Sequence, residues 1–145
     1  MANQTQRPDT ALHNTSHLMQ YHDLIESIVA AMDARDAYTA KHSDRVADMV
    51  LVLATALDLS EDETTLLHMA AHLHDIGKIA VPDSVLRKAG PLTSPEWEEM
   101  RRHPVTGYEI LRKVDDFKEI AVLVRHHHEP VSYTHLRAHE TTLHL

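Results

Sequence analysis

Apolar side chains recur at steps of three and four residues through most of this chain, and no segment alternates with a period of two for long. This spacing places apolar residues on one face of a helix, as in the run from Tyr21 to Met32. The 3 Gly and 6 Pro among 145 residues are too few for short strands joined by tight turns. The sequence therefore predicts an all-α fold, a helical bundle without a sheet.

Local signals predict where the helices begin and end. Two capping-box patterns mark helix starts: Ser60 with Glu63, and Thr93 with Glu96. The helix before the first of these carries its apolar face at Val46, Met49, Val50, Leu53 and Leu57. Residues 74–90 read as a loop with one short helical turn at 83–88. A helix break is expected near Pro104, and a last amphipathic helix at 117–128.

Composition excludes several classes of protein. With 14 Lys and Arg against 22 Asp and Glu, the net charge of −8 argues against nucleic acid polymers or anionic membranes as main partners. No Cys is present, which rules out disulfides and thiolate ligands and suits the cytoplasm. The longest apolar stretch, 49–57, is far shorter than the ~20 residues that span a bilayer. The length fits one domain.

The most unusual number is the 14 His, about one residue in ten. Several fall at helix ends or loops, and each comes from a different predicted helix: His42, His74 with Asp75, His103, and His126 to His128. Helical bundles build metal sites in this way. Imidazole with carboxylate suits Fe, Mn, Zn or Ni, and a carboxylate can bridge two ions. Two ions about 3.5–4 Å apart can drive phosphoester hydrolysis, and Lys78 is placed to neutralise a phosphate oxygen.

Each of these histidines also has an ordinary explanation. An isolated His42 is typical of a structural or surface residue, and a triple His run suits the negative end of a helix dipole. His68 and His72 share one helical face at a spacing that can bind metal, but a polar pair on an exposed helix explains them as well. We therefore interpret six histidines as background: His13, His17, His22, His68, His72 and His126.

The ordered motifs strongly resemble the HD-GYP family of HD-domain phosphohydrolases over about residues 20–129. They read DAYTAKHSDRV at 36–46, HDIGKI at 74–79, PDSVLRKAGPLT at 82–93, EW at 96–97, HPVTG at 103–107 and HHE at 127–129. A His-Asp pair alone would be weak, whereas this ordered combination is very specific.

The resemblance implies hydrolysis of cyclic di-GMP, a cyclic dinucleotide second messenger, on a site with two or three metal ions. The implied metal ligands are His42, His74, Asp75, His103, His127 and His128. Asp75 would bridge and Lys78 would be the lysine of the catalytic loop. Glu129 sets the register of the His-His-Glu motif, and Tyr38 stands where members with a third metal tend to carry Glu. The implied cofactors are two divalent ions, Fe or Mn before Ni or Zn.

The sequence also departs from the family. The Gly-Tyr-Pro motif expected after Glu129 and a later Asp ligand are absent, and 131–141 resembles a translated sequencing adapter. We therefore expect a leader or linker end at 1–17, a partial HD-GYP domain at 18–129 and a non-native tail at 130–145. The parent protein is expected to be a hydrolase, with an upstream receiver or sensor domain possible, and this fragment to be impaired.

Three other functions stay open at this point. One is another HD-type phosphohydrolase that acts on nucleotides or other cyclic dinucleotides. A second is a non-catalytic signalling module that binds nucleotide, against which the intact set of His and Asp residues argues. The third is an all-α interaction domain with incidental histidines, which would require the ordered motifs to arise by chance.

Overall fold

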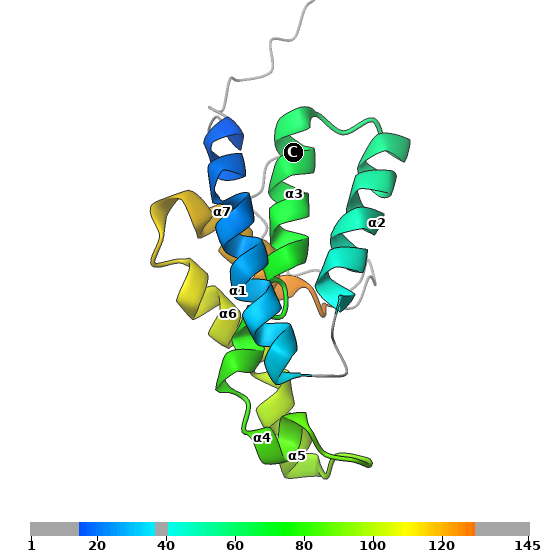
Figure 1. The fold of residues 1–145 in the computed structure, drawn as a ribbon, viewed down its shortest axis with the longest axis vertical. Helices are drawn as coiled ribbons and strands as arrows, with labels where there is room; N and C mark the ends of the chain where they lie inside the picture. Colours follow the sequence, from blue (N-terminus) through cyan, green and yellow to red (C-terminus); the bar gives the residue numbers. More distant parts are fainter. Residues whose placement is uncertain (1–14, 37–40, 130–145) are drawn as a thin grey trace, which may run out of the picture. The chain divides into compact units, whose positions relative to one another are not determined.

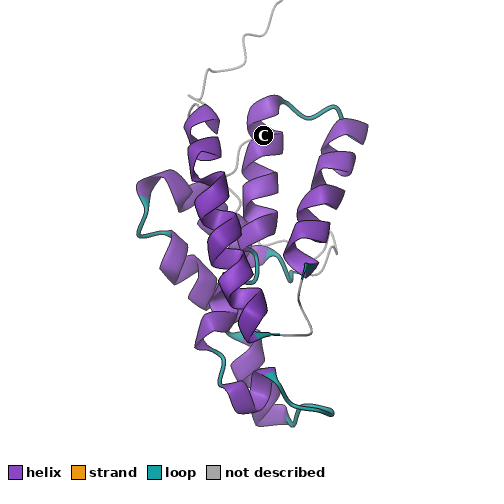
Figure 2. Cartoon of the chain, in the orientation of Figure 1, coloured by secondary structure: helices purple, strands orange, loops and turns teal. Residues whose placement is uncertain are grey.

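A computed structural model of the chain describes residues 15–36 and 41–129. Every regular element in those residues is a helix, which confirms the predicted all-α class (Figure 2). The chain divides into two compact units, 1–73 and 74–145, and each is described here by itself. None of the helices in the described ranges combines the length and apolar character that crossing a bilayer requires.

The first unit is built around its last helix. Its elements are η1 (Thr15–Tyr21), α1 (His22–Arg35), α2 (His42–Ala56) and α3 (Glu61–Leu73). Helix α3 packs against η1, α1 and α2 (Figure 1). The core contains Leu18, Ile25, Val29, Met69 and Leu73, all buried. Element η1 begins at Thr15, so helical structure starts inside the segment predicted as a leader.

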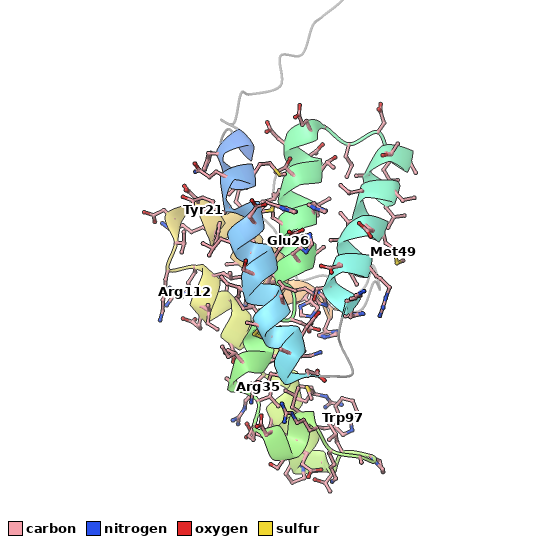
Figure 3. All side chains as sticks on the ribbon, viewed as in Figure 1. Tyr21, Glu26, Arg35, Met49, Trp97 and Arg112 are labelled. Atoms are coloured by element: carbon pink, nitrogen blue, oxygen red, sulfur yellow. The ribbon has the colours of Figure 1, made fainter. Side chains whose placement is uncertain are left out.

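The apolar face predicted for α2 is not the buried one. Met49, Leu53 and Leu57 are 63%, 56% and 68% exposed, and Met49 points away from the neighbouring helices (Figure 3). The buried residues are instead small: Ser43, Ala47 and Ala54. Small side chains allow α3 to approach the α2 backbone closely, so packing selects the face with the least bulk. Periodicity located the helix correctly and assigned the wrong face to the core.

The second unit contains shorter elements. They are η2 (Ile76–Ala80), α4 (Asp83–Leu86), α5 (Ser94–Arg101), α6 (His103–Leu111), η3 (Asp115–Phe117) and α7 (Lys118–His126). Helix α6 packs against both η2 and α7. The core of the second unit is formed by Val81, Val85, Leu111, Ile120 and Val124.

The helix starts follow the local signals. The backbone N–H of Glu63 donates to the Ser60 hydroxyl and that of Ser60 to the Glu63 carboxylate, at 3.2 and 2.8 Å. The second box, at Thr93 and Glu96, is also present. Helices α5 and α6 are separated at Arg102, which confirms the break expected near Pro104. The predicted turn at 83–88 is α4, and the predicted last helix at 117–128 is α7 at 118–126.

Gly77 sets how closely η2 approaches α6. A Cβ atom at this position would lie 1.8 Å from the carbonyl oxygen of His103 and 2.6 Å from the backbone nitrogen of Gly107. Both neighbours are backbone atoms of α6, so neither can rotate away. The absence of a side chain at Gly77 therefore lets η2 lie directly against the first turns of α6.

We expect Gly77→Ala to lower the free energy of unfolding by about 3 kcal/mol, the upper end of the range for overpacked cores. Urea denaturation followed by circular dichroism measures the change. Gly107→Ala is the matched comparison, because its Cβ would meet a side-chain atom, Cγ1 of Val124 at 2.9 Å, rather than a backbone atom. We expect this variant to lose less stability than Gly77→Ala, because a side-chain methyl group can shift more easily than a helix backbone and Ala also favours a helix over Gly. Equal losses in the two variants would contradict the backbone contact.

Candidate metal centre

Three parts of the second unit bring the predicted ligands together. His74 and Asp75 form the turn that leads into η2, His103 is the first residue of α6, and His127 and His128 follow the end of α7. Ligand atoms of His103, His127 and His128 all lie within 4.8 Å of one another. The contact of η2 with α6 carries Asp75 to the same place, with its Oδ1 3.3 Å from Nε2 of His103.

Two of these imidazoles are oriented by backbone carbonyls. Nδ1 of His103 donates to the Met100 carbonyl at 2.7 Å, and Nδ1 of His127 donates to the Val124 carbonyl at 2.7 Å. Since a carbonyl only accepts, the proton of each neutral ring sits on Nδ1 and the lone pair on Nε2. The two Nε2 atoms lie 3.3 Å apart. Hydrogen bonding of the outer nitrogen is the usual way in which proteins orient metal-binding histidines.

The Asp75 carboxylate faces partners on both of its oxygens. Oδ1 is directed at His103, whereas Oδ2 lies 3.3 Å from Nε2 of His74 and 2.8 Å from Nζ of Lys78. A carboxylate that presents one oxygen to each of two imidazole groups has the arrangement that bridging two cations requires. Both Asp75 and Lys78 are mostly buried, with 15% and 18% of their side chains exposed.

The surroundings set the charge of three of the predicted ligands. Burial alone would raise the pKa of Asp75, but hydrogen bonds and positive charge from His74 and Lys78 outweigh it and hold that pKa well below its usual range. Burial, together with the charges of His128, His74 and His103, lowers the pKa of His127 to about 4, although its hydrogen bond to the Val124 carbonyl acts in the opposite direction. Burial also lowers the pKa of His103. At neutral pH the carboxylate is therefore ionised and these two rings are neutral, which are the forms that bind metal.

These residues fit a divalent ion. Two nitrogens bound to one ion at ~2.0–2.1 Å lie about 2.8–3.4 Å apart, for bond angles between a right angle and a tetrahedral angle. The 3.3 Å between the Nε2 atoms of His103 and His127 falls in this range. The donor set of imidazole nitrogens with a carboxylate oxygen also suits borderline divalent metals.

Other predicted residues lie elsewhere. His42 is the first residue of α2, in the first unit, and its role as a ligand stays a prediction. Tyr38 and the segment 130–145 lie outside the described residues. Nδ1 of His126 donates to the Val122 carbonyl at 2.9 Å, and its Nε2 lies 3.7 Å from the Glu129 carboxylate.

The structure also groups three histidines that the sequence analysis interpreted as background. They are His22, His68 and His72, in the first unit. His72 is only 5% exposed, so the expected exposed polar pair was wrong. The four-residue spacing of His68 and His72 is the one sequence signal for this cluster. The third ring, that of His22, could not be assigned to it from the sequence, because it lies 46 residues before His68 at the start of another helix.

The chain is similar to known proteins over most of its length. The HD domain family matches residues 39–144. The cyclic di-GMP phosphodiesterase response regulator RpfG of Xanthomonas campestris is 41% identical over 108 residues, 72% of this chain and 29% of the relative. A cyclic di-GMP phosphodiesterase of Pseudomonas aeruginosa is 41% identical over 103 residues, 68% of this chain and 24% of the relative. A 3′3′-cGAMP-specific phosphodiesterase of Vibrio cholerae is 37% identical over 123 residues, 82% of this chain and 27% of the relative. This chain thus spans less than a third of the length of these relatives.

We expect His127→Gln to weaken binding of Mn²⁺ in the second unit by at least about 100-fold, because it removes a ligand rather than an outer hydrogen-bond partner. Isothermal titration calorimetry of tag-free protein measures the affinity. His126→Gln is the matched control, since it alters the adjacent histidine of the same run, which hydrogen-bonds to Val122 and faces Glu129. Equal weakening by the two substitutions would show that the assigned register is wrong.

Proposed function

We propose, on the premise that this chain belongs to the HD domain family, that it forms the metal-binding part of a phosphodiesterase that hydrolyses cyclic di-GMP. The relatives named as cyclic di-GMP phosphodiesterases also confirm the predicted HD-GYP membership. The observation that carries the proposal is the two-sided Asp75 carboxylate, with Oδ1 toward His103 and Oδ2 toward His74 and Lys78.

The ligand residues would hold two divalent ions, with His42, His74, Asp75, His103, His127 and His128 as the proposed set. Fe or Mn is the expected metal, and Ni or Zn the alternative, because mixed imidazole and carboxylate sites accept all four. Bound there, the ions would supply a water acidified for attack and positive charge for the phosphate oxygens. The protein would hold the two ions at a fixed separation, with the Asp75 carboxylate between the ion bound by His74 and the ion bound by His103.

Lys78 contributes in two ways. Its ammonium group donates to Oδ2 of Asp75 at 2.8 Å and so keeps the carboxylate ionised and correctly turned. The same cation lies beside the proposed ligands, where it would face the negative charge that develops on the phosphate during hydrolysis. Since η2 is held against α6 through Gly77, Lys78 and His103 keep a fixed relative position.

The substrate class rests on the relatives. Some are named for cyclic di-GMP and others for 3′3′-cGAMP, which has the same cyclic pair of 3′–5′ phosphodiesters. Hydrolysis of 3′3′-cGAMP is therefore the second candidate activity. Because RpfG is named a response regulator, we also propose an upstream receiver or sensor domain in the whole protein, and a cytoplasmic location.

We further propose that residues 130–145 are not native, as their resemblance to an adapter predicts. Sequencing of the source locus tests this directly, and a genomic reading frame that continues through 131–141 unchanged would contradict it. The same experiment supplies the continuous frame after Glu129 from which the whole protein can be produced.

We expect the whole protein, loaded with Mn²⁺ or Fe²⁺, to convert cyclic di-GMP to its linear dinucleotide. The 145-residue chain should do so slowly or not at all. Asp75→Asn should lower the rate by at least about 100-fold because it disrupts the shared metal ligand. Lys78→Met should lower it by a similar factor through loss of charge stabilisation. Liquid chromatography of the products measures each rate, with 3′3′-cGAMP as a parallel substrate.

The control for this assay is His126→Gln, which should leave the rate unchanged. Metal content and circular dichroism of each variant separate loss of ions from loss of fold. A metal-loaded whole protein that binds either dinucleotide without cleaving it would contradict the proposal and favour a signalling module that only binds nucleotide.

A further inference from the structure

Three imidazole rings converge in the first unit, where the proposed hydrolase chemistry has no use for them. His22 is the first residue of α1, and His68 and His72 lie one turn apart on α3. The ring centroids are 5.5 Å apart for His22 and His68, 5.3 Å for His22 and His72, and 4.7 Å for His68 and His72. The packing of α1 on α3 therefore gathers side chains that are distant in sequence (Figure 1).

The ring nitrogens meet at a distance that suits a shared ion. Nε2 of His68 lies 3.4 Å from Nε2 of His22 and 3.3 Å from Nε2 of His72. One ligand atom from each of the three residues lies within 4.8 Å of the others. Nitrogens bound to one tetrahedral zinc ion at ~2.0–2.1 Å are about 3.3–3.4 Å apart. Both measured separations match this value.

Hydrogen bonding among the rings does not account for both contacts. Nδ1 of His68 faces the Ala47 carbonyl at 3.3 Å, so it carries the proton and leaves Nε2 with a single lone pair. That lone pair can accept one N–H, from His22 or from His72. The other ring is then left at 3.3–3.4 Å without a hydrogen bond to His68. A cation at the centre would be bound by the lone pairs of all three nitrogens.

The outer nitrogens of His22 and His72 lie near carboxylates. Nδ1 of His72 is buried, forms no hydrogen bond within the described residues, and lies 3.7 Å from the Asp44 carboxylate. Nδ1 of His22 lies 3.7 Å from the carboxylate of Glu26, one turn further along α1 and labelled in Figure 3. At 3.7 Å these carboxylates are beyond hydrogen-bond distance of the ring nitrogens, and they add negative charge around the site.

We propose that His22, His68 and His72 form a second, separate metal site that binds one zinc-like divalent ion through their Nε2 atoms. The set contains no carboxylate between the rings, which favours a single borderline ion over a bridged pair. Three protein ligands leave a fourth position open. Of the three ligands, His22 is partly exposed, with 21% of its side chain accessible to solvent. The ion joins the start of α1 to α3.

The test uses Co²⁺, whose visible absorption reports four-coordinate geometry. The 145-residue chain is prepared without a polyhistidine tag and carries Asp75→Asn and His127→Gln, so that the site of the second unit is disabled. We expect this background to bind one equivalent of Co²⁺ with a strong visible band, to lose the band when Zn²⁺ is added, and to unfold at a higher temperature with Zn²⁺. Failure of the proposed hydrolase activity would leave this result unaffected.

His22→Gln and His68→Gln, each added to the background, should weaken Co²⁺ binding by at least about 100-fold and abolish the thermal shift. His17→Gln is the control, because it removes a nearby histidine of η1 that is not in the cluster. Circular dichroism establishes that each variant is folded. If His68→Gln does not fold, His22→Gln at the partly exposed start of α1 decides the question. Absence of Co²⁺ binding in the background, or equal binding by the His17 and His22 variants, would overturn the proposal.

Discussion

The close contact between Gly77 and the backbone of His103 is the constraint on which the second unit depends. It is a contact between main chains, so it fixes η2 on α6 without the freedom that a side-chain contact would leave. Asp75 lies two residues before Gly77 and His103 is itself the contacted residue, so the main-chain positions of Asp75 and His103 are set relative to each other by this contact. The ionic contacts of Lys78 and His74 then determine how the carboxylate is turned.

Local interactions were predictable because they lie within a few residues. The Ser60–Glu63 and Thr93–Glu96 boxes depend on side chains that reach backbone groups three positions away, and both formed as expected. The buried face of α2 was not predictable from its large apolar residues. Close approach of α3 requires small side chains, so Ala47 and Ala54 face the core while Met49 and Leu57 are exposed.

The proposed site residues were found through an ordered set of motifs, whereas the cluster around His68 has no such signature. Its rings come from the start of α1 and the second half of α3, and only tertiary packing shows that they meet. The two clusters also differ chemically. In the second unit, Asp75 adds a carboxylate that can join two ions, while in the first unit the carboxylates of Asp44 and Glu26 lie outside the rings.

The end of α7 leads directly into two of the proposed ligands, His127 and His128. His127 donates from Nδ1 to the Val124 carbonyl, one of the carbonyls that a helix end leaves without a partner in its own turn. The partial negative charge at this end of a helix favours a nearby cation. The same imidazole therefore contacts the last turn through one nitrogen, and the other is the nitrogen proposed to bind metal. Binding of a metal ion by His127 would therefore be coupled to ordering of the last turn of α7, so each would stabilise the other.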